Sequence, residues 1–275
     1  MADVKAFQYA TPEPARDAAD RFGRLHGALE LKAALLALLL PPGSHRAVRA
    51  FEIETAEIRP AETLLMHAQN LPGPSRLPWF ELLLTRMALQ PLALRQELLQ
   101  ATRRVMSSRG GSRSVDRLHW LAMRRGLGEA LITTPRPPAA VDVDEWLETD
   151  LLAIARYASF LARMVPAEAT DGDENPSGAA WYATVMEPWQ GGAALPALEV
   201  PGGEAALKAL ATLQTLAMMQ RPLLVRGWVA AALKHARHHR WTDSAADALR
   251  LTCGLLDTPM PDDLARHFPV LEAAK

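Results

Sequence analysis

The chain has 275 residues, with 30 Lys and Arg residues against 31 Asp and Glu residues, so its formal net charge is -1. This length can bury one large or two small hydrophobic cores, and the balanced charge argues against a dedicated nucleic-acid-binding protein. Alanine and leucine supply 49 and 43 residues, whereas isoleucine and valine supply only 4 and 12. Because helices favour Ala and Leu while strands favour β-branched residues, the composition predicts an all-α fold.

Proline and glycine divide the first half of the chain into segments with helical periodicity. The expected helices cover residues 15–40, 45–58, 60–71, 77–89, 91–106 and 114–127. A Pro-rich segment at 133–140 follows and marks the expected domain boundary. We therefore predict an N-terminal helical unit at 1–132, a linker at 133–140 and a C-terminal helical unit at 141–275.

The C-terminal unit has the same character but contains one irregular stretch, at 166–203. The expected helices cover residues 144–164, 181–189, 204–219, 222–238 and 243–256, with a short tail at 261–274. Residues 91–127 and 222–256 form an internal repeat, since each has a proline that opens a helix, a turn and a second helix. Pairing the two repeats buries both apolar stripes, so we expect tandem units packed as one helical bundle.

These two repeats carry a resemblance to a known family. The cues are the apolar run at 35–40, the segment 77–81, the helix–turn–helix at 91–127, the segment 223–256 and the motif at 258–261. Over residues 25–130 and 205–264 the chain resembles the TerB-like helical domain, named for a tellurite-resistance protein. It is also similar to the helical region that follows the membrane-bound zinc peptidase in some bacterial M48-type proteins.

The chain departs from that family where the family's chemistry lies. Some members hold a cation at an acidic turn, but here the turns carry Gly110-Gly111 and His238-His239, and Arg117 stands where a Glu is expected. No His is followed by Glu, so the zinc-peptidase motif His-Glu-x-x-His is absent. The sequence therefore predicts no catalytic residue, no metal and no cofactor.

One pair of histidines has a spacing that is found in zinc sites. His235 and His239 are four residues apart, so both imidazoles can share a helical face and bind zinc. Arg237 and Arg240 crowd them with positive charge, however, and cationic residues at a helix C-terminus are stabilised by the helix dipole without a metal. We favour the second interpretation.

Basic residues gather around the first repeat's turn. The basic surface expected there consists of Arg103, Arg104, Arg109, Arg113 and Arg117, with Arg124 and Arg125 beyond it. No aromatic ladder accompanies these residues, as binding to a single-stranded nucleic acid would require. A solvated face is the simplest interpretation, and contact with an acidic protein or with phospholipid headgroups stays open.

The irregular stretch supplies the predicted partner site. Its candidate anchor residues are Trp181, Tyr182, Met186 and Trp189, which a purely solvated linker would avoid. Two outcomes are open: these side chains either fill the groove where the two units meet or project toward a partner. We adopt the partner site as the hypothesis.

The sequence also gives expectations for the location and function of the protein. The most apolar stretch, 29–40, ends at Pro41-Pro42 and is too short to span a bilayer, so we expect no membrane span, with peripheral association open. The single cysteine, Cys253, excludes an internal disulfide framework, and a bacterial cytoplasmic location fits. We expect a non-catalytic helical adaptor or scaffold that binds another protein, in a peptidase or membrane-associated complex. The alternatives are a hydrolase, metal-dependent or not, with a dispersed active site, and a secreted effector or its immunity partner.

Overall fold

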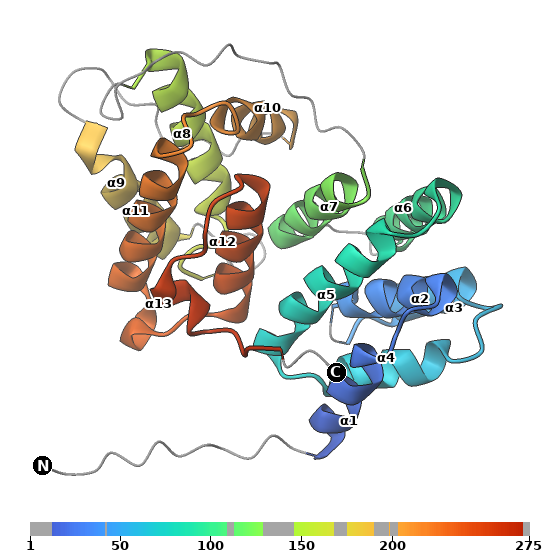
Figure 1. Ribbon diagram of the computed structural model, residues 1–275. Helices are drawn as coiled ribbons and strands as arrows, with labels where there is room; N and C mark the ends of the chain where they lie inside the picture. The colour runs from blue at the N-terminus through green and yellow to red at the C-terminus, as the bar shows by residue number, and fades with distance from the viewer. Residues whose placement is uncertain are drawn as a thin grey trace, which may run out of the picture. The chain divides into compact units, whose positions relative to one another are not determined.

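The all-α prediction is confirmed by the computed structural model of the chain (Figure 1). The structure describes residues 13–41, 43–108, 113–128, 146–167, 175–189, 198 and 203–271, and within these ranges the chain forms helices and no strand. The chain divides into two compact units, one of residues 1–109 with 270–275 and one of residues 110–269. We call them unit 1 and unit 2 and describe each by itself.

Unit 1 is built around one helix that is buried on every side over most of its length. Its helices are α1 (Glu13–Gly23), α2 (Ala28–Leu39), α3 (His45–Glu54), α4 (Ala61–Asn70), α5 (Gly73–Ala88) and α6 (Leu92–Ser107). Every residue of α2 from Leu31 to Leu39 is buried, and α4 and α5 pack against it. A helix that is hydrophobic all round belongs in a core. None of the helices described is both long and apolar enough to cross a membrane.

The single helix expected at 15–40 is wrong, because the chain breaks between Gly23 and Ala28 into α1 and α2. The break is held by an arginine of α5. The guanidinium of Arg86 donates to the carbonyl oxygens of Phe22 and Leu25 at 3.1 and 2.9 Å. These carbonyls lie at the C-terminal end of α1, where the helix offers them no partner of its own.

A second arginine of α5 closes two further helix ends. Arg76 donates to the carbonyl oxygens of Leu38 and Leu40, at the end of α2, and to that of Ala68 in the last turn of α4, at 3.0 to 3.2 Å. A guanidinium presents five N–H groups in a rigid fork, so one side chain can satisfy several carbonyls. Helix α5 therefore caps the ends of α1, α2 and α4 in addition to packing on them.

Unit 2 contains the remaining helices. They are α7 (Ser114–Gly126), α8 (Glu148–Leu161), α9 (Pro176–Met186), the 3-10 turn η1 (Glu187–Trp189), α10 (Gly203–Leu213), α11 (Gln220–His235), the 3-10 turn η2 (Arg237–His239), α12 (Asp243–Leu255) and α13 (Asp262–Ala265). Helix α8 packs on α10, α7 on α12, and α9 on α11 (Figure 1). The core is rich in rings, with Tyr157 stacked on Trp228 at a centroid distance of 5.8 Å.

The C-terminal end of α12 joins three parts of unit 2. Arg125 of α7 donates to the carbonyl oxygen of Leu255 and pairs with Asp257, while Arg221 of α11 donates to the carbonyl oxygen of Leu256 at 2.8 Å. Gln214, just after α10, donates to Leu255 at 2.8 Å. The last carbonyls of α12 thus receive donors from α7, α11 and the end of α10.

The predicted division of the chain needs correction. The expected linker at 133–140 lies outside the described residues, and the compact units divide between Arg109 and Gly110. Helix α7, which the sequence placed in the N-terminal unit, belongs to unit 2. It packs there on α12 with Leu118 among its buried residues, and its Arg125 caps that helix. The first predicted repeat is therefore split between the two units.

The stretch expected to be irregular, 166–203, contains helix α9. Its N-terminus carries standard signals: Asn175 is the N-cap, with its Oδ1 accepting from the backbone N–H of Gly178 at 3.1 Å, and Pro176 opens the first turn. The Asn175 amide also donates to the carbonyl of Ala162 at 2.9 Å, which fixes the start of α9 against the end of α8. The expected helix 181–189 thus begins five residues earlier and ends at Met186, with η1 following it.

Gly178 permits that close approach, and its replacement tests the packing. A Cβ at position 178 would lie 1.9 Å from the carbonyl oxygen of Ala162, far inside van der Waals contact. We expect Gly178→Ala to destabilise the protein by about 3 kcal/mol through overpacking. Gly227→Ala and Gly254→Ala are matched controls, because a Cβ at those helical positions meets nothing within 4 Å. They should leave the protein unchanged or up to about 1 kcal/mol more stable in urea unfolding followed by circular dichroism. A neutral Gly178→Ala would contradict the described contact of α8 with α9.

Candidate functional site

Three of the four predicted partner anchors lie in the core of unit 2. Trp181, Tyr182 and Met186 are 0%, 7% and 1% exposed, so the prediction that they project toward a partner is wrong for these three. The indole N–H of Trp181 donates to the carbonyl oxygen of Trp228 at 3.0 Å, which satisfies its one polar atom inside the protein. They share the inner face of α9 because their spacing, 181, 182 and 186, fits one side of a helix.

The fourth anchor is different. Trp189 lies in η1, is half-buried, and meets the ring of Trp146 edge to face at a centroid distance of 5.8 Å. Trp146 is also half-buried and lies two residues before the start of α8. Much of the Trp189 surface is therefore used by a contact within unit 2.

The predicted basic surface does not form a single described feature. Arg103 and Arg104 lie on α6 in unit 1, Arg113 and Arg117 lie in unit 2, and Arg109 is outside the described residues. Two of the arginines are paired locally. Arg104 forms an ion pair with Glu54, and Arg113 pairs with Asp116 at 3.1 Å at the start of α7. The hydrogen bond from Arg104 lowers the pKa of Glu54, so this carboxylate stays ionised beside it.

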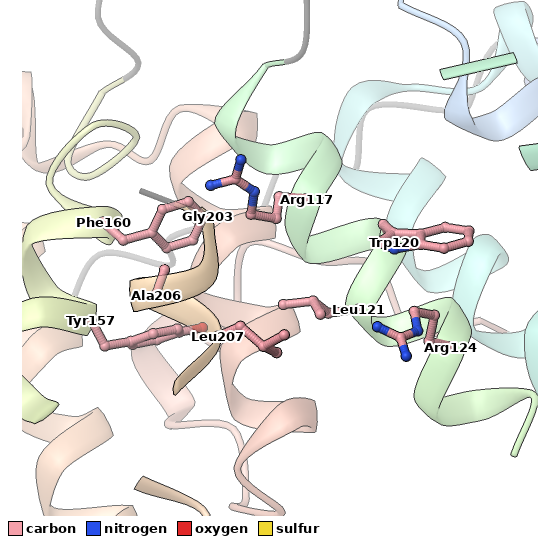
Figure 2. A pocket seen from close by; sticks show the side chains of 9 residues that line it. All are labelled: Arg117, Trp120, Leu121, Arg124, Tyr157, Phe160, Gly203, Ala206 and Leu207. Atoms are coloured by element: carbon pink, nitrogen blue, oxygen red, sulfur yellow. The ribbon is translucent and has the colours of Figure 1, made fainter. Parts of the chain in front are cut away.

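Arg117 lines a cavity. A pocket of about 140 Å³ lies within unit 2, between α7 on one side and α8 and α10 on the other (Figure 2). Its lining residues are Arg117, Trp120, Leu121, Arg124, Tyr157, Phe160, Gly203, Ala206 and Leu207. We call this the α7–α10 pocket.

Helical periodicity explains why these residues meet. The α7 residues 117, 120, 121 and 124 follow the spacing that places side chains on one face of a helix, as do 157 and 160 of α8 and 203, 206 and 207 of α10. Leu121 and Leu207 point toward each other across the pocket (Figure 2). The floor is apolar, since Tyr157 and Phe160 are each 1% exposed and present only their rings.

Arg117 holds one end of the pocket. Its guanidinium carbon lies 5.9 Å from the ring centroid of Phe160, a cation–π contact. It also packs directly on Gly203, the first residue of α10, where a Cβ would lie 2.7 Å from that carbon. Glycine at position 203 therefore lets the guanidinium sit against the start of α10 (Figure 2).

The nearest carboxylate in sequence to that contact is bound elsewhere. Glu204 follows Gly203, but its carboxylate pairs with Lys208 one turn along α10 at 2.8 Å. The hydrogen bond from Lys208 lowers the pKa of Glu204. In the described part of the chain Arg117 has the ring of Phe160 as its partner and no ion pair, and none of the nine lining residues is acidic.

Tyr157 contributes its ring to the pocket floor. Burial raises the pKa of its hydroxyl well above the usual range, so the phenol stays protonated. Its hydroxyl lies 3.0 Å from the Thr252 Oγ1, inside the core.

The histidine pair does not share a helical face. Helix α11 ends at His235, and the chain then leaves helical geometry, with φ angles of 56° at His238 and 52° at His239. His235 Nε2 lies 2.7 Å from the hydroxyl of Thr184, whereas the Nδ1 of His239 faces the carbonyl oxygen of Leu233 at 3.2 Å. Across the described ranges no three His, Cys, Asp or Glu residues gather in a way that could hold a metal ion.

Comparisons with known proteins found no matching family model, no matching curated protein and no matching solved structure. Sequence reasoning singled out Arg117 and Arg124 as part of a basic cluster but missed the pocket, because α8 and α10 supply its other wall from residues 33 or more positions away. The periodic run of Arg, Trp, Leu and Arg on one helical face was the available signal.

Replacing each tryptophan of the predicted partner site separates core from surface. We expect Trp181→Ala to destabilise the protein by about 3–5 kcal/mol, because it removes a fully buried ring and leaves a cavity. Trp189→Ala should cost about 1 kcal/mol, since that ring is half-exposed and loses mainly its contact with Trp146. Urea unfolding of the two variants measures the difference. Equal and small losses would return Trp181 to the role of a partner anchor.

Proposed function

We propose that the protein is a non-catalytic helical adaptor that binds another protein through the α7–α10 pocket. The observation that carries the proposal is the size and lining of this pocket. Its volume of about 140 Å³ is close to that of an engineered apolar cavity of about 150 Å³ that holds benzene. Pockets for drug-sized ligands run from about 300 to 1,000 Å³. The α7–α10 pocket thus suits a single side chain of a larger partner.

The mode of binding follows from the three helices. Leu121, Phe160 and Leu207 supply an apolar seat, and the lining is preformed by helices packed within one unit. A side chain seated in a preformed pocket is the usual form of an interface hot spot. This supports an adaptor role more than it supports turnover of a substrate.

Three further parts of the proposal come from the sequence. We propose that the protein is TerB-like, that it lies in the bacterial cytoplasm and that it acts together with a peptidase or a membrane-associated complex. They depend on the apolar motifs and on composition.

The proposal is tested by photo-crosslinking from the rim of the pocket. A photoreactive phenylalanine analogue is placed at Leu207, which is half-exposed, or at Leu152, which is 37% exposed on α8 and does not line the pocket. We expect one protein to be crosslinked from position 207 in cells and not from position 152. Once identified and purified, it should bind the unmodified chain and Leu152→Gln but bind Leu207→Gln at least about tenfold more weakly, because a buried amide replaces an apolar contact.

Two results would overturn the adaptor proposal. One is that the same proteins are crosslinked from both positions and that Leu207→Gln binds them normally. The other is that the purified protein turns over a small-molecule or peptide substrate in a way that Leu207→Gln abolishes, which would favour the hydrolase alternative.

A further inference from the structure

The α7–α10 pocket is lined by positively charged side chains as well as apolar ones. Arg117 and Arg124 flank Leu121 on α7, one on each side, and lie seven residues apart, which is about 10 Å along a helix. Both are half-buried, so their guanidinium groups belong to the pocket wall. None of the nine lining residues is acidic and Arg117 has no ion pair in the described part of the chain, so the potential beside Arg117 is positive.

The surroundings of Arg117 add to this potential. Its guanidinium packs on Gly203 at the N-terminus of α10, where the helix dipole contributes partial positive charge. Glu204 is held by Lys208, so the adjacent carboxylate does not bond Arg117. The ring of Phe160 leaves the N–H groups at the edge of the guanidinium plane available for an oxygen ligand.

We propose that the occupant of the α7–α10 pocket is an acidic peptide segment with a single apolar anchor. The anchor side chain enters between Leu121 and Leu207, and a carboxylate beside it pairs with Arg117. This inference depends on the proposed adaptor function and names the chemistry of the partner at the same site.

A protein segment fits this pocket better than a lipid surface does. The residues of a membrane-surface helix project into the headgroup layer, whereas Arg117 lies against Phe160 and Gly203 in the pocket wall. The apolar seat of about 140 Å³ also accepts one side chain and is too small for an acyl chain to lie along. Charge complementarity and pocket size together select the acidic peptide.

The test uses three labelled synthetic peptides and the full-length protein. The first has two acidic residues on each side of one leucine, the second replaces every acidic residue by lysine, and the third replaces the leucine by alanine. By fluorescence anisotropy we expect the acidic leucine peptide to bind most tightly, with an affinity that falls as salt is added. The alanine peptide should bind several-fold more weakly, and the lysine peptide should show no binding.

Variants then locate the binding. Arg117→Gln should weaken binding of the acidic peptide about tenfold, since it removes a charge-assisted hydrogen bond. The double variant Arg156→Gln with Arg226→Gln, which removes two exposed charges of unit 2 outside the pocket, is the matched control and should bind normally. Replacing both pocket arginines by glutamate should reverse the preference toward the lysine peptide. This gain of binding keeps the test decisive if the Arg117→Gln variant loses stability.

Four other results would each reject the acidic-peptide inference. Equal binding of the acidic and lysine peptides would overturn it, as would loss of binding in the Arg156 and Arg226 control. Binding to phosphatidylserine vesicles that depends on Arg117, without binding of the acidic peptide, would assign the site to a lipid surface. If crosslinking from Leu207 still identifies a partner while the acidic peptide has no preference, the adaptor proposal stands and only the chemistry named here fails.

Discussion

Arginine bound to helix C-termini is the interaction on which the rest of the structure depends. Four guanidinium groups, those of Arg76, Arg86, Arg125 and Arg221, donate to carbonyl oxygens at the ends of other helices. A chain of short helices has many such ends, and each leaves carbonyls without a partner and carries partial negative charge. Lysine supplies a point charge, whereas the planar fork of arginine reaches two or three carbonyls at once. This interaction gives a structural role to four of the 25 arginines in the sequence.

The same interaction positions the α7–α10 pocket. Arg125 fastens the end of α7 to the end of α12, and Gln214 fastens the segment after α10 to the same carbonyl of Leu255. The two walls of the pocket are thus both tied to the carbonyl of Leu255, although they come from distant parts of the sequence. Arg117, two turns before Arg125 on α7, then faces α8 and α10 with a ring as its partner. An arginine that lies beside a helix end binds backbone carbonyls there, and one that does not can line a pocket instead.

The sequence predicted what depends on local chemistry. Composition gave the all-α class, and the apolar run in α2 gave a buried helix. The Pro-rich segment at 133–140 suggested a boundary, but the compact units divide before α7 because α7 packs on α12, a contact between residues more than 100 positions apart. Trp181 looked like an anchor because it lies in the stretch 166–203, which was expected to be irregular, whereas Gly178 in that stretch allows α9 to approach Ala162 closely. The pocket escaped prediction because three separate helices line it.

The central claim is that Arg117, unlike the arginines that cap helices, offers its guanidinium to a ligand. Side-chain NMR of the arginine Nε–H groups tests it directly, with Arg117→Lys to assign the signal. On addition of the acidic leucine peptide, the account predicts that the Nε–H signal of Arg117 shifts to saturation while those of Arg125 and Arg221 stay in place, because the latter are held by Leu255 and Leu256. An Arg117 signal that stays unmoved while the peptide binds, or equal shifts for all three arginines, would contradict the account.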